Sequence, residues 1–250
     1  MNREKIDIPK INDSIVEKIV DGIRLGYIEY LDEIIDKSGS GKIYSGYRWT
    51  KSNHIDNNIR EQLTKSSTIE IHRNKIKSNG WQFNSYVTDQ ITFIQKPISY
   101  INDKSNFKGM GKENGGYISI LSNKTNKSLF QDLGIQTDSI SIGQIELLDT
   151  FNDNSSDLFI NSGVFYLVTY NIGSDKNINK IEVYAACNGQ CIRIQDLSEA
   201  NSASIIEIPR DLLDQVTNED AIGYEHNSNF YPDNSKYNSL YNNIKINKKL

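Results

Sequence analysis

The chain has 250 residues, 37% of them hydrophobic and 24% charged, which is enough apolar material for one or two globular domains. A formal net charge of −4 argues against general electrostatic binding to nucleic acid, and two cysteines are too few for a disulfide scaffold. No stretch approaches the ~18 apolar residues of a membrane span. The opening "MNREKIDIPK" also lacks the apolar segment of a signal peptide. We therefore expect a cytoplasmic protein without a membrane partner.

Two helices are predicted near the N-terminus. Good N-cap residues at 12–14 precede a run of Ile, Val and Tyr at helical spacing, which ends at the glycine-rich stretch 38–41. Gly22 and Gly26 disfavour a helix, so we expect a close backbone contact or a kink there. The second helix runs through "SNHIDNNIREQL", with one apolar face formed by Ile55, Ile59 and Leu63.

Alternation of apolar and polar residues then predicts strands near 68–78, 81–87 and 90–96, with a hairpin turn at Asn79-Gly80. "YISIL" is predicted to be a short strand, and "SLFQDL" and "IGQIELLDTF" to be short helices. A second group of strands is expected at 162–171, 179–187 and 190–195, followed by a short helix at "RDLLDQV".

These elements predict an α+β fold in which N-terminal helices pack on a largely antiparallel sheet built from hairpins. We expect a single domain over residues 1–222, with a subdivision near 97–117 as the alternative. Residues 223–250 are rich in Asn and Tyr, which predicts a C-terminal tail or docking arm.

Both cysteines lie in "YAACNGQCIRI". A two-residue turn at Asn188-Gly189 would place Cys187 opposite Gln190 and Cys191 opposite Ala186. Because side chains alternate along a strand, the two thiols would then lie on opposite faces of the hairpin. The spacing therefore predicts neither a disulfide nor a shared metal ion.

Carboxylates recur at helical spacing in one segment, at Glu146, Asp149, Asp153 and Asp157. Such a series is typical either of a solvent-exposed helix face or of a divalent-metal site for phosphodiester hydrolysis. We favour the exposed face. Glu146, Asp149 and Asp153 remain the alternative metal ligands, and otherwise no metal or cofactor is expected. The histidines, His54, His72 and His226, show no catalytic spacing and are expected in surface or capping roles.

A tract of lysines interleaved with aromatic residues is the strongest indication of binding. Exposed aromatics beside basic loops could hold single-stranded nucleic acid, although Trp81, Phe83 and Phe93 alternate as core residues would. The candidate binding residues in this tract are Lys104, Lys108, Lys112, Tyr117, Lys124 and Lys127. Tyrosines provide contact area at low entropic cost, and those of the tail are Tyr231, Tyr237 and Tyr241.

The long first helix, "YRWTKSNHIDNNI", "NGWQFNSYVTDQITFIQK" and the hairpin "VFYLVTY…IEVYAAC" occur in an order that resembles a family of proteins from low-GC Gram-positive bacteria and their phages. The resemblance covers about the first 100 residues. It implies a cytoplasmic setting and a role near mobile elements, and it implies no catalytic residues.

The sequence thus favours a non-catalytic protein that binds another macromolecule through protein–protein contact, for example in bacterial defence or counter-defence against phage. The alternative is a metal-dependent nuclease, or a nucleic-acid-binding protein that uses the lysine tract.

Overall fold

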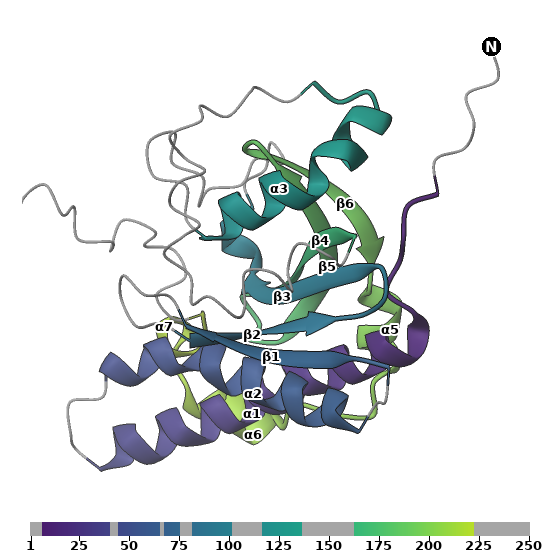
Figure 1. The fold of residues 1–250 in the computed structure, drawn as a ribbon. Coiled ribbons are helices and arrows are strands. Elements are labelled where there is room, and N and C mark those ends of the chain that lie inside the picture. The colour runs from purple at the N-terminus through teal and green to yellow at the C-terminus, as the bar shows by residue number, and fades with distance from the viewer. Residues whose placement is uncertain are drawn as a thin grey trace, which may run out of the picture.

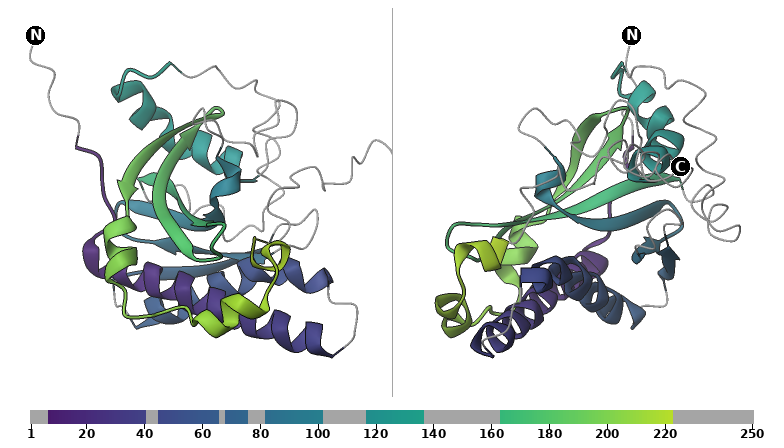
Figure 2. Two further views of the ribbon diagram at one scale, coloured as in Figure 1. Left: turned by 180° about the vertical axis from the view of Figure 1, so that it is seen from behind. Right: turned by 90° about the vertical axis from the view of Figure 1, so that its left-hand side faces the viewer.

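The computed structural model describes residues 7–40, 45–65, 68–75, 82–101, 117–136 and 163–222. Its elements form three layers, with helices α1 and α2 on one face of a six-stranded sheet and α3 on the other (Figure 1, Figure 2). Three short helices follow the last strand and pack against α1. This is the α+β arrangement of N-terminal helices on a mostly antiparallel sheet that the sequence predicts.

The helices are α1 (Asp13–Gly39), α2 (Lys51–Thr64), α3 (Tyr117–Asp132), α5 (Ser198–Ala203), α6 (Arg210–Gln215) and α7 (Asn218–Ile222). The strands are β1 (Glu70–Lys75), β2 (Gln82–Val87), β3 (Ile91–Pro97), β4 (Val164–Ile172), β5 (Ile178–Cys187) and β6 (Gln190–Asp196). Two 3-10 turns, η1 (Ser45–Thr50) and η2 (Ile98–Tyr100), precede α2 and follow β3.

The first helix begins where the sequence predicts. The side chain of Asn12 accepts a hydrogen bond from the backbone N–H of Ile15 at 3.0 Å, which satisfies one of the amide groups left open at a helix start. Apolar residues then recur every three or four positions, so they form one side of α1 that faces the sheet and α2. The apolar residues on this side, from Ile15 to Ile34, are buried.

Helices α1 and α2 pack so closely that their backbones nearly touch. A Cβ atom added at Gly22 would lie 2.5 Å from the Cα of Ile59, and one added at Gly26 would overlap the Cα of Ile55. The glycines therefore lower helix propensity but allow this contact, and of the two predicted outcomes, a close contact or a kink, the structure shows the close contact.

The six strands lie in the order in which they occur in the chain, β1 to β6. All neighbours are antiparallel except β3 and β4, which are parallel. A parallel pair requires a crossover connection, and α3 lies between these two strands in the chain. Each set of three strands is thus a meander, and α3 covers the face of the sheet opposite α1 and α2.

Buried Asn126 attaches α3 to the sheet. Its Nδ2 donates to the carbonyl oxygens of Phe165 on β4 at 2.7 Å and Ala186 on β5 at 2.9 Å. Its Oδ1 accepts from the N–H of Phe165 at 2.8 Å. The amide side chain thereby satisfies backbone groups of both strands at the position where the helix crosses them.

The prediction of a strand at "YISIL" is wrong, because these residues form the start of α3. The residues that follow are polar. In the helix, however, Ser122 donates to the carbonyl oxygen of Ile118 at 2.6 Å and Thr125 donates to that of Leu121 at 2.9 Å. These hydroxyls bond back along the helix, so polar side chains are accommodated within a continuous helix.

The hairpin of β5 and β6 has the predicted register. Asn188 and Gly189 both have positive φ, 47° and 81°, as a tight two-residue turn requires. Cys187 pairs with Gln190 and Cys191 with Ala186. Cys187 lies in the core beneath α1 and α2, whereas Cys191 lies in the core beneath α3. Both thiols are buried and unlinked, on opposite faces of the sheet.

The segment 198–222 fastens the helical layer to the end of the sheet. Tyr30 of α1 donates to the carbonyl oxygen of Asp220 at 2.6 Å. Lys176, in the β4–β5 turn, donates through Nζ to the carbonyl oxygens of Leu213 at 2.6 Å and Val216 at 2.8 Å. Helix α6 agrees with the prediction at "RDLLDQV", whereas α5 and α7 were not predicted.

Replacing Gly22 with alanine should destabilise the fold by about 2–3 kcal/mol, because the new methyl group meets backbone atoms of α2 that cannot rotate away. Gly39→Ala is the matched control. No atom lies within 4 Å of a Cβ at that position of α1, so its stability should change by less than about 1 kcal/mol. Urea unfolding measures both. Equal stabilities of the two variants would contradict the close contact between α1 and α2.

Candidate protein-binding face

His54 of α2 lies between two carboxylates of α1. Its Nε2 is 2.6 Å from Oε2 of Glu33, and its Nδ1 is 3.5 Å from Oε2 of Glu29. Because an ionised carboxylate only accepts hydrogen bonds, Nε2 donates in the shorter contact. Thr50 donates to Glu33 at 3.3 Å, and Asn58 donates to Glu29 at 2.7 Å. The imidazole therefore links α1, η1 and the start of α2, which is a structural role.

His72 lies on a different element, β1, with Nε2 3.4 Å from Oε2 of Glu70. The two described histidines thus contact different carboxylates, His54 on α2 and His72 on β1. His226 lies outside the described residues.

Glu182 on β5 is a fully buried carboxylate with three hydrogen-bond partners. Oε2 accepts from Nζ of Lys180 at 2.9 Å and from the hydroxyl of Tyr184 at 2.9 Å. Oε1 accepts from Nη1 of Arg193 at 2.7 Å, and Arg193 also lies 3.3 Å from Asp196. Both carboxylate oxygens are engaged and shielded from solvent, so this cluster joins β5 to β6 and presents no open base to a substrate.

Within the described part of the chain, no three His, Cys, Asp or Glu side chains are placed to hold a metal ion. The alternative metal ligands Glu146, Asp149 and Asp153 lie outside the described residues. So do several of the candidate binding residues, namely Lys104, Lys108, Lys112, Tyr231, Tyr237 and Tyr241.

The remaining members of the lysine tract lie on α3. Lys124 and Lys127 are exposed on its outer side, one turn apart, and Tyr117 is its first residue. Of the aromatics interpreted as core, Phe83 and Phe93 are buried, and Trp81 lies outside the described residues. Lys124 and Lys127 are thus on the side of the sheet opposite α1 and α2.

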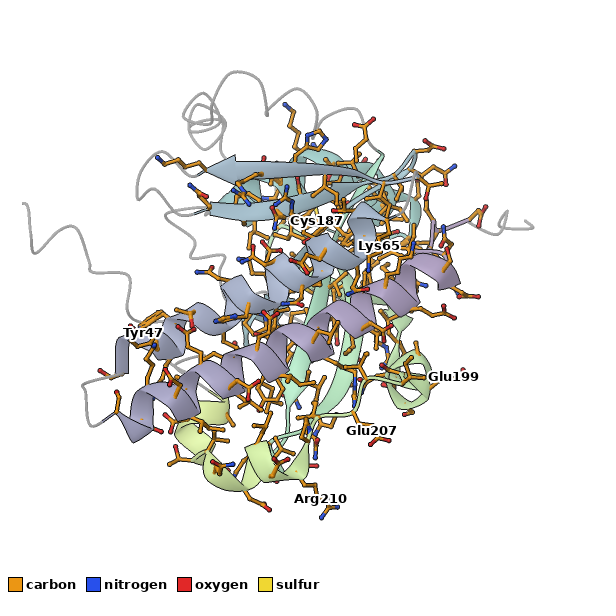
Figure 3. All side chains as sticks on the ribbon, turned by 90° about the horizontal axis from the view of Figure 1, so that it is seen from below. Tyr47, Lys65, Cys187, Glu199, Glu207 and Arg210 are labelled. Carbon is orange, nitrogen blue, oxygen red and sulfur yellow. The ribbon has the colours of Figure 1, made fainter. Side chains whose placement is uncertain are left out.

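Large apolar side chains reach the surface at three positions in the described residues, and two of them are in η1. Tyr47 is 37% exposed and Trp49 is 48% exposed. Figure 3 shows Tyr47 at the far end of the α1–α2 pair, where α1 ends and α2 begins. Trp and Tyr are the residues most often found at the energetic centres of protein–protein interfaces.

Arg48, which lies between these two aromatics, is directed toward the interior. Arg48 is only partly exposed and donates from Nε to Oδ1 of buried Asp220 at 2.7 Å, which ties η1 to α7. Lys37 at the end of α1 places its Nζ 5.5 Å from the centre of the Tyr47 ring. These contacts hold the turn in place, so Tyr47 and Trp49 are presented on a fixed backbone.

The elements that contact η1 are rich in carboxylates. Helix α1 carries seven acidic and three basic residues, whereas the whole chain has a net charge of only −4. Residues 198–222, which pack along α1, carry six acidic residues and one basic residue. We call the outward surface of α1, η1 and residues 198–222 the acidic face. Its exposed or half-exposed carboxylates include Glu17, Asp21, Glu29, Asp32, Glu33, Asp36, Glu199, Glu207, Asp211 and Asp214.

The sequence analysis did not identify η1 as a binding element. "SGYRWT" lies between two amphipathic helices, where a turn is expected to be polar. Two aromatic residues in such a turn could have indicated a binding element. The inward direction of Arg48 depends on Asp220, which is 172 residues away in the chain and cannot be predicted from local pattern.

No family model, curated protein or solved structure matches the chain. None of the helices in the described ranges has both the length and the apolar character needed to cross a membrane.

Replacing Glu182 with glutamine should lower stability at pH 7, because the amide would direct N–H groups toward Lys180 or Arg193. Burial raises the pKa of Glu182, but hydrogen bonds from Arg193, Lys180 and Tyr184 outweigh burial and bring the pKa below its ordinary value of 4.5. The ionised carboxylate thus contributes stability above the unfolded pKa, and this contribution is lost as the pH falls through the folded pKa.

Urea unfolding of the wild type and Glu182→Gln at pH 7 and at about pH 3 measures this dependence. The difference between the two proteins should shrink in acid. Glu70→Gln, which alters an exposed carboxylate, is the control and should change little at either pH. A difference for Glu182→Gln that is the same at both pH values would contradict the ion-paired state of Glu182.

Proposed function

We propose that this protein is a non-catalytic binding protein that contacts another protein through the acidic face, with Tyr47 and Trp49 at the centre of one contact region. The observation that carries the proposal is the exposure of both aromatics on one turn whose backbone is held by Arg48 and Asp220. A turn that is already ordered loses little conformational freedom on binding, which favours affinity.

The charge of the face indicates the chemistry of the partner. Exposed carboxylates are spread along α1 and residues 198–222, so a surface rich in Lys and Arg would be attracted to the acidic face and would be oriented during association. Basic surfaces of this kind are typical of proteins that bind nucleic acid, because they must neutralise phosphates. A partner of that class would also be present in the proposed setting of conflict between bacteria and phage.

The alternative is binding or cleavage of nucleic acid. Lys124 and Lys127 favour it, because they are exposed together on α3, on the opposite side of the molecule from the acidic face. A nuclease would in addition require the carboxylates Glu146 and Asp149, so alanine substitutions of these two residues would abolish a metal-dependent cleavage activity.

The double variant Tyr47→Ala, Trp49→Ala should lose the partner protein. Loss of even one aromatic hot spot at the centre of an interface costs about 2 kcal/mol, so we expect the affinity of the double variant to fall by at least about 30-fold. The measurement is affinity purification of the tagged full chain from cells of its natural source, followed by calorimetry with the purified partner. Binding by the wild type should also weaken as salt is added, because salt screens the carboxylates.

Lys124→Ala, Lys127→Ala is the matched control, since it also removes two exposed side chains from one element. The control should retain the protein partner. Thermal unfolding should show that both double variants fold. Retention of the same partner by the Tyr47 and Trp49 variant would refute the proposal. Co-purification of nucleic acid that is lost only in the lysine variant would establish the alternative.

A further inference from the structure

The third exposed apolar residue, Ile205, also lies on the acidic face. It is 87% exposed, in the short connection between α5 and α6. The sequence there is "SIIEIP", and its three isoleucines differ in environment: Ile208 is buried, Ile206 is half-buried and Ile205 projects into solvent. A single exposed isoleucine on a loop without fixed contacts would not indicate a binding site, because isolated apolar residues are common on protein surfaces.

Ile205 differs because the residues on both sides of it are fixed to α1. The hydroxyl of Ser204 donates to Oδ1 of Asp21 at 2.6 Å and accepts from the N–H of Ile206 at 3.2 Å. The carbonyl oxygen of Ile206 accepts from Nε of Arg24. The backbone on either side of Ile205 is therefore attached to the long helix, and its side chain is held in an exposed position.

A second contact of Arg24 extends this attachment to the sheet. Nη1 of Arg24 donates to Oδ1 of Asn201 at 3.0 Å, and Nδ2 of Asn201 donates to the carbonyl oxygen of Ile178 on β5 at 2.9 Å. Burial lowers the pKa of Arg24, while the carboxylates of Asp21 and Glu207 act in the opposite direction. The positive charge of Arg24 is thus directed inward, and acidic groups dominate the surface around Ile205.

We infer that Ile205 is a second anchor of the acidic face, which inserts into an apolar pocket bordered by Lys or Arg side chains on the partner protein. The inference rests on the proposed function and specifies the chemistry of the partner. Exposed Glu199 and Glu207 lie along the same segment, as Figure 3 shows, and they complement such a border. A second copy of this chain is the less suitable occupant, because two acidic faces would repel each other.

The two anchors are close enough to serve one interface. Asp21, which holds the Ile205 loop, and Lys37, which contacts Tyr47, are separated by sixteen positions along α1, or about 24 Å. A standard interface covers about 800 Å² on each partner, which is a patch about 30 Å across. The separation of the two anchors along the axis of α1 is therefore within the span of one standard interface.

The first test places the photo-reactive residue p-benzoylphenylalanine at position 205 of the full chain, and at position 124 as the control. Cells of the natural source are irradiated, and the attached peptide is identified by mass spectrometry. We expect position 205 to form an adduct with a second protein, at an apolar site flanked by Lys or Arg, and position 124 not to form it. No adduct at 205, or an adduct with another copy of this chain or with nucleic acid, overturns the inference.

The second test measures the affinity of the cross-linked partner by calorimetry. Ile205→Ala should raise Kd by about tenfold or more, whereas Ile205→Val, which retains most of the side chain, should raise it by less than about threefold. Neither variant should alter the thermal unfolding temperature, since the side chain is exposed. If Tyr47→Ala, Trp49→Ala abolishes binding while Ile205→Ala leaves Kd unchanged, the inference is wrong and the proposed function stands. If neither variant weakens binding, the proposed function fails.

Discussion

The close contact between α1 and α2 at Gly22 and Gly26 is the constraint on which the rest of the helical layer depends. With no side chains between the helices at these positions, their backbones come together, and His54 is brought between two carboxylates of α1. The same approach places Asp56 of α2 against the sheet, where its carboxylate accepts a hydrogen bond from the backbone N–H of Asn84 at 2.8 Å. Larger residues at the two glycines would move α2 away from both of these partners.

In the described part of the chain, the sheet lies between the acidic residues of the α1 layer and two exposed lysines of α3. Both of its faces are covered by helices, with α1 and α2 on one side and α3 on the other, and each side has its own apolar core. The acidic residues of α1 and of segment 198–222 gather on one side, whereas Lys124 and Lys127 lie on the other. Among the described residues, the fold therefore separates the carboxylates of α1 and segment 198–222 from Lys124 and Lys127, which the net charge of −4 alone does not show.

Elements with regular periodicity could be predicted from the sequence, and those that depend on distant partners could not. The isoleucine spacing of α1 and the Asn188-Gly189 turn each determine their own geometry locally, and both predictions are confirmed. The prediction of a helix at "SLFQDL" is confirmed by the end of α3, whereas the start of α3 was predicted to be a strand. The packing of α3 could not be read from local pattern, because its buried Asn126 is polar and satisfies strands that lie about 40 and 60 residues away. The exposed positions in η1 and near Ile205 were missed for the same reason, since residues far along the chain orient them.

Two arginines explain why the acidic face can present apolar side chains in fixed positions. Arg48, from the N-terminal half, binds Asp220 of α7, while Arg24 of α1 binds the carbonyl oxygen of Ile206 in the C-terminal segment. Each arginine therefore links a residue in the first 50 positions to one beyond position 200. Each contact holds the backbone beside an exposed apolar residue. Their positive charges are used internally, so the carboxylates around them remain available at the surface. This combination of held apolar groups and surrounding carboxylates is the basis on which we propose a basic protein partner rather than nucleic acid.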